Sequence, residues 1–205
     1  MRVLQLLPEL KFGGVERGTV DLSEHLTKLG HQSAVVSAGG GLTEQLSNHG
    51  AKHFTLPIAK KNFLAIKQYK NLRDIYREFK PDIIHVRSRF PAWINVLALK
   101  GLSSSKPIVI STFHGLYSKP FYSKSMSYAN DIIAISKTVQ KYVFKNYDVD
   151  HSRVHLIYRG CDINEFNTSA PLEAWSNAWY QEFPQTSNKI LLTLPGRITG
   201  WKGIE

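Results

Sequence analysis

Short apolar runs alternate along this chain with longer segments in which apolar residues recur at helical spacing. The first run, residues 3–7, predicts a buried strand, and residues 15–29 predict an amphipathic helix that Gly30 ends. Further strands are predicted over residues 33–37, 52–56, 83–86, 108–111, 132–135 and 154–158. Further helices are predicted over residues 42–48, 65–79 and 93–99, and after Ser136, whose hydroxyl can cap a helix.

This alternation predicts the fold class. Strands that are apolar throughout, each followed by a helix, are typical of a parallel sheet that is covered on both faces. We therefore expect an α/β protein with a Rossmann-like parallel sheet. Ligands of such sheets bind beyond the carboxyl ends of the strands, so residues that directly follow a strand are the first candidates for function.

The pattern changes after about residue 167, which suggests a domain boundary. We expect residues 1–167 to form the Rossmann-like domain and the tryptophan-rich residues 168–187 to form a helix and a linker. Residues 189–194 predict one more strand, followed by a basic, glycine-containing loop. We interpret residues 188–205 as the start of a second domain; a last edge strand of the first sheet is the alternative.

Two candidate positions follow predicted strands of the first domain. Gly13 and Gly14 precede the first helix, where backbone amides and the helix N-terminus can bind an anion, although a glycine pair also suits a plain turn. The glycine spacing differs from the dinucleotide fingerprint, which argues against a dehydrogenase. His114 follows the strand at residues 108–111 and can donate a hydrogen bond to a ligand oxygen, or to its own loop.

Two further groups of residues combine cations with glycine or aromatic residues. Arg197 and Lys202 follow the strand at residues 189–194, and their charges suit a diphosphate, although solvated surface cations explain the spacing equally well. Residues 117–124, which include Tyr117 and Lys119, can stack on a sugar ring or bind a phosphorylated acceptor. The same residues can instead form a loop that packs on the domain.

The charge balance points to an anionic partner. Lysine and arginine number 26 against 16 aspartates and glutamates, for a net charge of +10. No helix-turn-helix, RRM, KH or zinc motif accompanies that charge, so we expect no nucleic-acid partner. One face of the helix predicted over residues 65–79 is basic, and it can lie on an anionic membrane or simply face solvent. Its cations are Lys67, Lys70, Arg73, Arg77 and Lys80.

Cysteine and histidine usage excludes some other classes. Cys161 is the single cysteine, so the chain can form neither an intrachain disulfide nor a cysteine metal cluster. The histidines show no ligand spacing, and we expect no metal site. No stretch approaches the roughly 20 apolar residues of a membrane span, and residues 1–8 are too short for a signal-peptide core. We expect a cytoplasmic protein, with peripheral docking on the inner membrane face as an option.

Four segments, taken in order, resemble motifs of the family 4 glycosyltransferases. Residues 12–17 resemble the opening glycine–glycine–x–glutamate–arginine motif, and residues 81–86 resemble the proline–aspartate strand that contains a histidine. Residues 158–166 resemble the asparagine–glycine–x–aspartate segment, with Arg159 in place of the asparagine. Residues 195–203 resemble the glycine–arginine to lysine–glycine motif that opens the donor domain. The spelling of the last two motifs is closest to bacterial members that build lipopolysaccharide or capsule.

The resemblance implies the N-terminal half of a two-domain GT-B fold and a retaining transferase that requires no metal or other cofactor. The first domain would bind a glycan or lipid-linked acceptor, and the second domain would bind a nucleotide-sugar donor. Arg197 and Lys202 would neutralise the leaving diphosphate together with amides at Gly13 and Gly14, and His114 would hold the transferred sugar. We assign acceptor binding to Glu16, Arg17, Arg87, Tyr117 and Lys119.

One departure from the family limits what this chain can do. The donor-domain glutamates of the family would lie beyond Glu205, so we expect the 205 residues alone to be inactive. A non-catalytic module that binds a phosphorylated glycan or lipid is the alternative function. A sugar-nucleotide epimerase is another possibility within the same fold.

Overall fold

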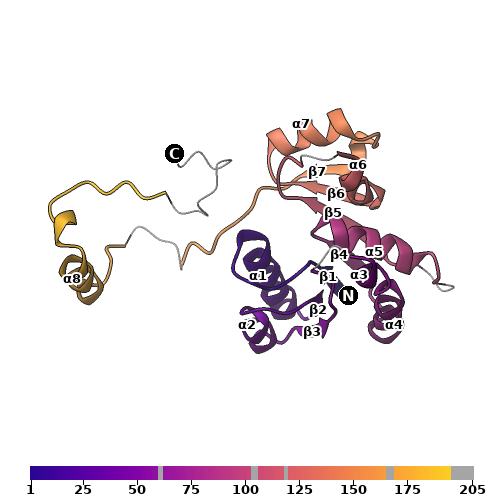
Figure 1. Ribbon diagram of the computed structural model, residues 1–205, viewed down its shortest axis with the longest axis horizontal. Helices are drawn as coiled ribbons and strands as arrows, with labels where there is room; N and C mark the ends of the chain where they lie inside the picture. Colours follow the sequence, from indigo (N-terminus) through magenta and orange to yellow (C-terminus); the bar gives the residue numbers. More distant parts are fainter. Residues whose placement is uncertain (60–61, 103–105, 118–119, 165–168, 195–205) are drawn as a thin grey trace. The chain divides into compact units, whose positions relative to one another are not determined.

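The computed structural model describes residues 1–59, 62–102, 106–117, 120–164 and 169–194 (Figure 1). The chain divides into two compact units, residues 1–159 and residues 160–205. The first unit contains the sheet and the residues that follow its strands, so it is the unit on which the site depends.

Seven strands form one sheet in which every pair is parallel. In chain order they are β1 (Arg2–Leu6), β2 (Gln32–Ser37), β3 (Lys52–Thr55), β4 (Ile83–Val86), β5 (Ile108–Phe113), β6 (Asp131–Ala134) and β7 (Val154–Leu156). Their order in the sheet is β3-β2-β1-β4-β5-β6-β7. The predicted fold class, a Rossmann-like parallel α/β sheet, is confirmed.

Helices connect the strands of this unit, as the sequence predicts. They are α1 (Gly14–Lys28), α2 (Thr43–Asn48), α3 (Phe63–Ile66), α4 (Tyr69–Phe79), α5 (Arg89–Leu99), α6 (Pro120–Ser123) and α7 (Lys137–Asn146). Two 3₁₀ helices, Lys124–Tyr128 and His151–Arg153, complete the connections. Helix α7 begins where predicted, because the Ser136 hydroxyl accepts a hydrogen bond from the Val139 amide at 3.2 Å.

The sheet buries apolar side chains on both of its faces. Successive residues of a strand point to opposite faces, and in β2 Val36 belongs to one core while Val35 belongs to the other. The larger core includes residues of α4, α5 and α7, and the smaller core includes residues of α1 and α2. Figure 1 shows α1 and α2 on one side of the sheet and α4 and α5 on the other.

The helix predicted over residues 65–79 is wrong in one respect, because two helices, α3 and α4, occupy this range. The side-chain oxygen of Asn62 accepts a hydrogen bond from the Ala65 amide at 2.8 Å, which caps a short separate helix. The Gln68 amide then donates to the Ala65 carbonyl, and this tighter bond across three residues ends α3. The predicted apolar face is nevertheless buried, as Ala65, Leu72 and Tyr76 show.

The second unit contains helix α8 (Glu173–Glu182) and a 3₁₀ turn (Pro184–Thr186). Trp175 stacks on Trp179, and Trp179 in turn contacts Phe183. The strand predicted over residues 189–194 is wrong, since these residues pair with no strand in the described part of the chain. A strand requires a neighbouring strand for its backbone hydrogen bonds, and the apolar side chains of Ile190 and Leu192 are exposed here.

Candidate functional site

The candidate site lies at the carboxyl edge of the sheet, where β1 and β4 are neighbours. From β1 the chain builds β2 and β3 in one direction, and it then returns to build β4 to β7 in the other. Ligands of open parallel sheets bind at such a switch point. Four residues lie at this edge. Gly14 begins α1 after β1, and Arg87 and His114 directly follow β4 and β5. Arg159 lies in the segment after β7.

Glycines in the first turns of α1 make room for two guanidinium groups. A β-carbon on Gly18 would lie 2.7 Å from Nη2 of Arg159 and 3.3 Å from Nη2 of Arg87, and a β-carbon on Gly14 would lie 3.1 Å from Nη1 of Arg159. The Arg159 guanidinium also donates a hydrogen bond to the Gly14 carbonyl. The two arginines therefore meet at Gly18, although they come from distant parts of the sequence.

The side chain of Gln5 in β1 holds the Arg87 guanidinium in place. Nη1 of Arg87 donates to Oε1 of Gln5 at 3.1 Å, and the Gln5 amide donates to the Thr19 carbonyl and to the Ser23 hydroxyl. Arg87 is buried, and its Nε has no hydrogen-bond partner among the described residues. Burial and then the nearby charge of Arg159 lower the pKa of Arg87 to about 10, against the opposing effect of Asp21 and Glu16.

His114 presents an uncharged imidazole at the same edge. Burial, followed by the charges of Arg87 and Arg159, lowers its pKa to about 3. A neutral ring offers one N–H donor and one acceptor nitrogen. Both ring nitrogens are buried and have no partner within the part of the chain that the structure describes. His114 is therefore ready to exchange hydrogen bonds with a polar ligand such as a sugar hydroxyl.

Tyr117 is held in place by several contacts, unlike an aromatic side chain in an open loop. Its ring contacts Phe113 with centroids 5.4 Å apart, and the Arg89 guanidinium lies 4.7 Å from its centroid. Its hydroxyl accepts a hydrogen bond from the His114 amide at 3.4 Å, and its carbonyl accepts one from Tyr142 at 2.6 Å. The hydroxyl of Tyr117 thus helps to hold the backbone of His114.

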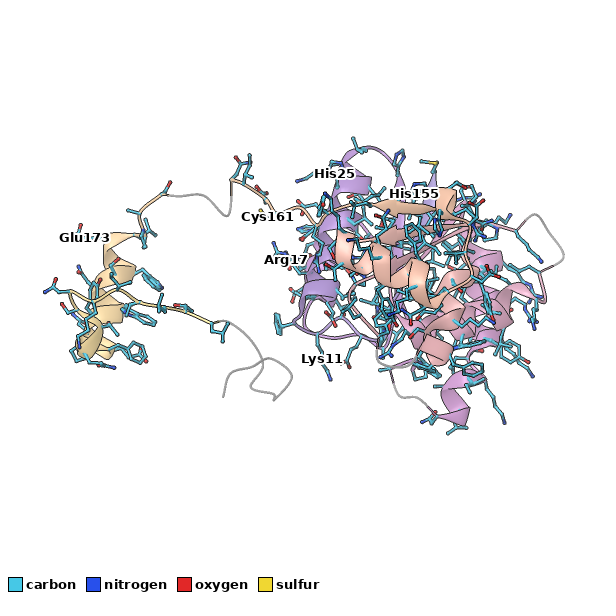
Figure 2. The ribbon with its side chains drawn as sticks, turned by 90° about the horizontal axis from the view of Figure 1, so that it is seen from above. Lys11, Arg17, His25, His155, Cys161 and Glu173 are labelled. Carbon is cyan, nitrogen blue, oxygen red and sulfur yellow. The ribbon has the colours of Figure 1, made fainter. Side chains whose placement is uncertain are left out.

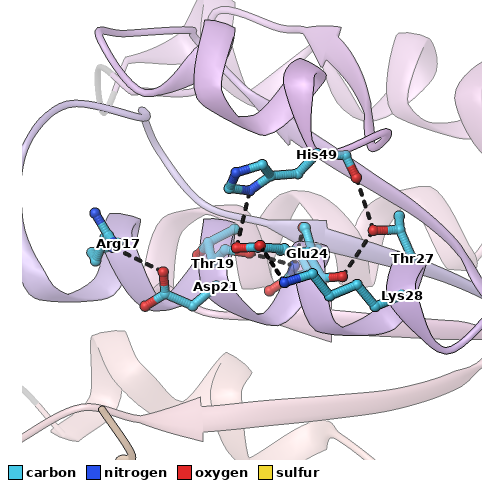
Figure 3. A network of polar contacts seen from close by, with 9 residues as sticks. Arg17, Thr19, Asp21, Glu24, Thr27, Lys28 and His49 are labelled. Atoms are coloured by element: carbon cyan, nitrogen blue, oxygen red, sulfur yellow. Dashed lines mark hydrogen bonds and ion pairs between the residues drawn. The ribbon is translucent and has the colours of Figure 1, made fainter. Parts of the chain in front are cut away.

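Glu16 and Arg17 lie in the first turns of α1. The Glu16 carboxylate folds back over Gly13, the residue that precedes the helix. Arg17 lies at the surface of the first unit (Figure 2), and its Nε donates to Asp21 at 2.8 Å (Figure 3). Figure 3 shows the network that continues along this helix, in which Glu24 contacts Lys28 and His49 and so connects α1 to the end of α2.

The predicted site residues divide into those that the structure brings together and those that it does not describe. Gly14, Arg87 and His114 converge with Arg159, while Tyr117 supports His114 from behind. Lys119, Arg197 and Lys202 lie outside the described residues. Sequence reasoning missed Arg159 and Gly18 as site residues. The available signals were the arginine that replaces the family asparagine and the four-residue spacing of Gly14 and Gly18.

A hollow lies elsewhere on this unit. A depression of about 470 Å³ is lined by Arg2, Tyr76, Arg77 and Asp82, among others, at the amino ends of β1 and β4. It is on the opposite edge of the sheet from His114, so it is separate from the site described above. No cluster of three potential metal ligands and no helix able to cross a membrane occurs in the described ranges.

Comparison with known proteins places this arrangement in a family. Residues 12–165, which include Gly14, Arg87, His114 and Arg159, match Glycosyltransferase Family 4. The chain belongs to this family. The resemblance inferred from the four sequence motifs is confirmed, and the carboxyl-edge site lies within the matched residues.

Solved structures of glycosyltransferases agree with this assignment. A glycosyltransferase of Rickettsia africae is 31% identical, with a TM-score of 0.81 over 98% of this chain and 54% of that protein. Anabaena HepE, solved with UDP and glucose, has a TM-score of 0.76 at 18% identity over 100% of this chain and 55% of its own.

The lipopolysaccharide outer core galactosyltransferase WaaB has a TM-score of 0.65 at 17% identity over 84% of this chain and 49% of its own. At these identities, HepE and WaaB support the GT-B fold alone. The chain therefore spans about half the length of each of these three proteins.

Proposed function

We propose that this chain is the acceptor-binding half of a retaining glycosyltransferase that transfers a sugar from a nucleotide-sugar to a glycan or lipid-linked acceptor. The observation that carries the proposal is the convergence of Gly14, Arg87, His114 and Arg159 at the switch point of the sheet, in a member of Glycosyltransferase Family 4. UDP-sugars are the first donors to test, because HepE was solved with UDP and glucose.

In the proposed mechanism, the groups around the leaving diphosphate stabilise negative charge that grows in the transition state. Arg197 and Lys202 would bind the diphosphate from the second domain, and amides at Gly13 and Gly14 would approach it from α1. His114 would exchange a hydrogen bond with the transferred sugar. A hydroxyl of the acceptor would attack from the face that the diphosphate leaves, so that the anomeric configuration is retained.

Glu16, Arg17, Arg87, Tyr117 and Lys119 would contribute to acceptor binding in this proposal. Cell-surface polysaccharide or lipopolysaccharide synthesis is the proposed process, and the fold shared with WaaB agrees with it. A cytoplasmic location follows from that process, because nucleotide-sugars are made in the cytoplasm. No metal or other cofactor is part of the proposal, because the cations take the role of a metal.

The exposed cations Lys70 and Lys80 support peripheral membrane docking through α4, together with the exposed Leu64 of α3, whereas Arg77 is exposed but pairs with Asp74 at 2.7 Å. Arg73 does not contribute, because its guanidinium donates to the carbonyls of Ala98 and Leu97 at the end of α5. Co-sedimentation with vesicles that contain anionic lipid, compared with neutral vesicles, tests this part. Equal recovery with both vesicle types would contradict it.

The transferase proposal is tested with the product of the complete reading frame, assayed for UDP release from UDP-sugars beside the 205-residue chain. We expect turnover by the complete product, none by the chain alone, and a product with the donor's anomeric configuration by NMR. His114→Ala should lower kcat/KM about 10- to 100-fold, because one hydrogen bond to the transferred sugar is lost. His25→Ala, at an exposed position of α1, is the matched control.

Three outcomes would contradict parts of this proposal. Inversion of the anomeric configuration would exclude the retaining mechanism. Turnover by the 205-residue chain alone would show that the second domain is dispensable. Binding of sugar phosphates without turnover by the complete product would favour the non-catalytic binding module.

A further inference from the structure

Two guanidinium groups share one place in the site without an anion between them. Nη2 of Arg87 and Nη2 of Arg159 both lie within 3.3 Å of the point that a β-carbon on Gly18 would occupy. Each known partner is neutral: Arg87 donates to the Gln5 side chain, and Arg159 donates to the Gly14 carbonyl. No ion pair of the described residues involves either arginine.

Two neighbouring guanidinium groups are unfavourable unless an anion binds between them. Bringing two like charges together, with Arg87 only 7% exposed, costs free energy that the neutral partners do not return. The N-terminus of α1, which adds partial positive charge, lies at the same place. The nearest acidic groups that act on Arg87 are Glu16 and Asp21, and Asp21 is already bonded to Arg17.

Free donors at this place are arranged for the oxygens of a small anion. Nε of Arg87 is buried and unpartnered in the described chain, and the neutral ring of the adjacent His114, whose two nitrogens are unpartnered there, adds one N–H donor. Guanidinium forks match the geometry of phosphate and carboxylate oxygens, and hydrogen bonds to a charged acceptor are about twice as strong as neutral ones. A neutral sugar would satisfy the donors but would leave both positive charges without compensation.

We propose that Arg87 and Arg159 form a two-arginine site for a phosphate or carboxylate group carried by the acceptor. Assignment to the acceptor rests on the proposed function, in which the first unit binds the acceptor. Both arginines, the glycines that make room for them and His114 belong to that unit. The preferred acceptor is therefore an anionic sugar or a phosphorylated lipid-linked sugar, not a neutral one.

The first test measures binding of inorganic phosphate to the 205-residue chain by isothermal titration calorimetry. Arg159→Gln should weaken phosphate binding at least about tenfold, because one charged fork is removed. Arg2→Gln removes the same charge at the amino edge of the sheet and should leave binding unchanged. Arg159 is exposed, so the variant should keep the fold, as its far-UV circular dichroism and thermal midpoint can verify.

A second variant tests the geometry without changing the charge. Gly18→Ala introduces a β-carbon that must displace the Arg159 guanidinium, and it should also weaken phosphate binding. Since alanine favours a helix more than glycine does, a stable Gly18→Ala protein that binds phosphate poorly separates the site from the fold. Undetectable phosphate binding to the wild-type chain, or binding that neither variant weakens, would overturn the proposal.

Competition identifies the source of the anion. We expect glucose 6-phosphate, as a phosphomonoester sugar, to displace phosphate in an Arg159-dependent way and UDP to leave it bound. If UDP displaces phosphate and Arg159→Gln weakens UDP, the pair binds the donor diphosphate and the acceptor assignment is overturned. The transferase proposal fails separately: a complete product that binds phosphate at this pair but turns over no sugar-nucleotide would refute the activity and keep the anion site.

Discussion

Gly18 makes its helix less stable but provides space that the site requires. Glycine inside a helix costs about 0.5–1 kcal/mol relative to alanine. Here the missing β-carbon leaves space for Nη2 of Arg159 and of Arg87 against α1. At this scale, the site depends on the absence of a side chain at Gly18 and on the two arginines that occupy the space.

His114 leads to a prediction about stability and pH at the same scale. Its pKa is about 3 in the folded chain, and an unfolded histidine titrates near 6.5. Between these values only the unfolded chain binds the proton, so the free energy of unfolding falls as the pH falls below about 6.5. One such group contributes up to about 1.4 kcal/mol per pH unit. Burial also lowers the pKa of His85 and of His53, so they act in the same direction.

We expect His114→Gln to make this pH dependence shallower between pH 7 and pH 5. Urea unfolding at several pH values in that window measures it, above the range in which most carboxylates titrate. His25→Gln, on the exposed surface of α1, is the control and should have the wild-type slope. Equal slopes for wild type and His114→Gln would show that His114 gains a proton in the folded state as readily as in the unfolded state.

At the scale of one element, α7 depends on a side chain at its start. The Ser136 hydroxyl accepts a hydrogen bond from the Val139 amide, which otherwise has no partner in the first turn of the helix. Ser88, the residue that precedes α5, has the same extended conformation, but its side chain makes no capping hydrogen bond. The two serines therefore allow a matched comparison of a working and a non-working cap.

Ser136→Ala should lower the free energy of unfolding by about 1 kcal/mol, the usual loss for an N-cap. Ser88→Ala should change it much less, and Ser136→Asp should retain stability because the carboxylate also accepts from the first turn. Chemical denaturation of the three variants measures these differences. A Ser88→Ala loss as large as that of Ser136→Ala would contradict the capping explanation.

At the scale of the whole molecule, the sheet and both of its cores lie within residues 1–159. Helix α8 buries none of its residues, and Ile190 and Leu192 are almost fully exposed. Apolar burial is the main source of stability, so residues 1–159 contain the burial on which their own fold depends.

We expect residues 1–159 to unfold in one cooperative urea transition on their own, because both cores lie within them. Removal of β7 as well, in residues 1–150, should lower the midpoint clearly, because β6 loses its hydrogen-bonded neighbour and Val154 leaves the core. Urea titrations followed by circular dichroism compare the three chains. A midpoint of residues 1–150 equal to that of residues 1–159 would contradict this role of β7, and the 205-residue chain serves as the reference.

The sequence by itself determined the alternation of strands and helices in residues 1–159, the fold class and the family, although it predicted one helix where α3 and α4 lie. Buried parallel strands contain short apolar runs, such as Ala34–Val36 of β2, and such runs are visible in the sequence without knowledge of any contact. It also predicted that Gly14 and His114 would lie at strand ends. The Ser136 cap was predictable for the same reason, because a cap is a local interaction.

Only the tertiary structure decided what depends on neighbours that are distant in sequence. The apolar pattern of residues 189–194 predicts a strand that did not form, because a strand depends on a hydrogen-bonded neighbour and the described chain supplies none. Likewise, nothing local to Arg159 shows that it meets Arg87 at Gly18. The parallel crossovers of the sheet bring Arg87 and Arg159 together, so the approach of these two charges depends on the topology of the sheet.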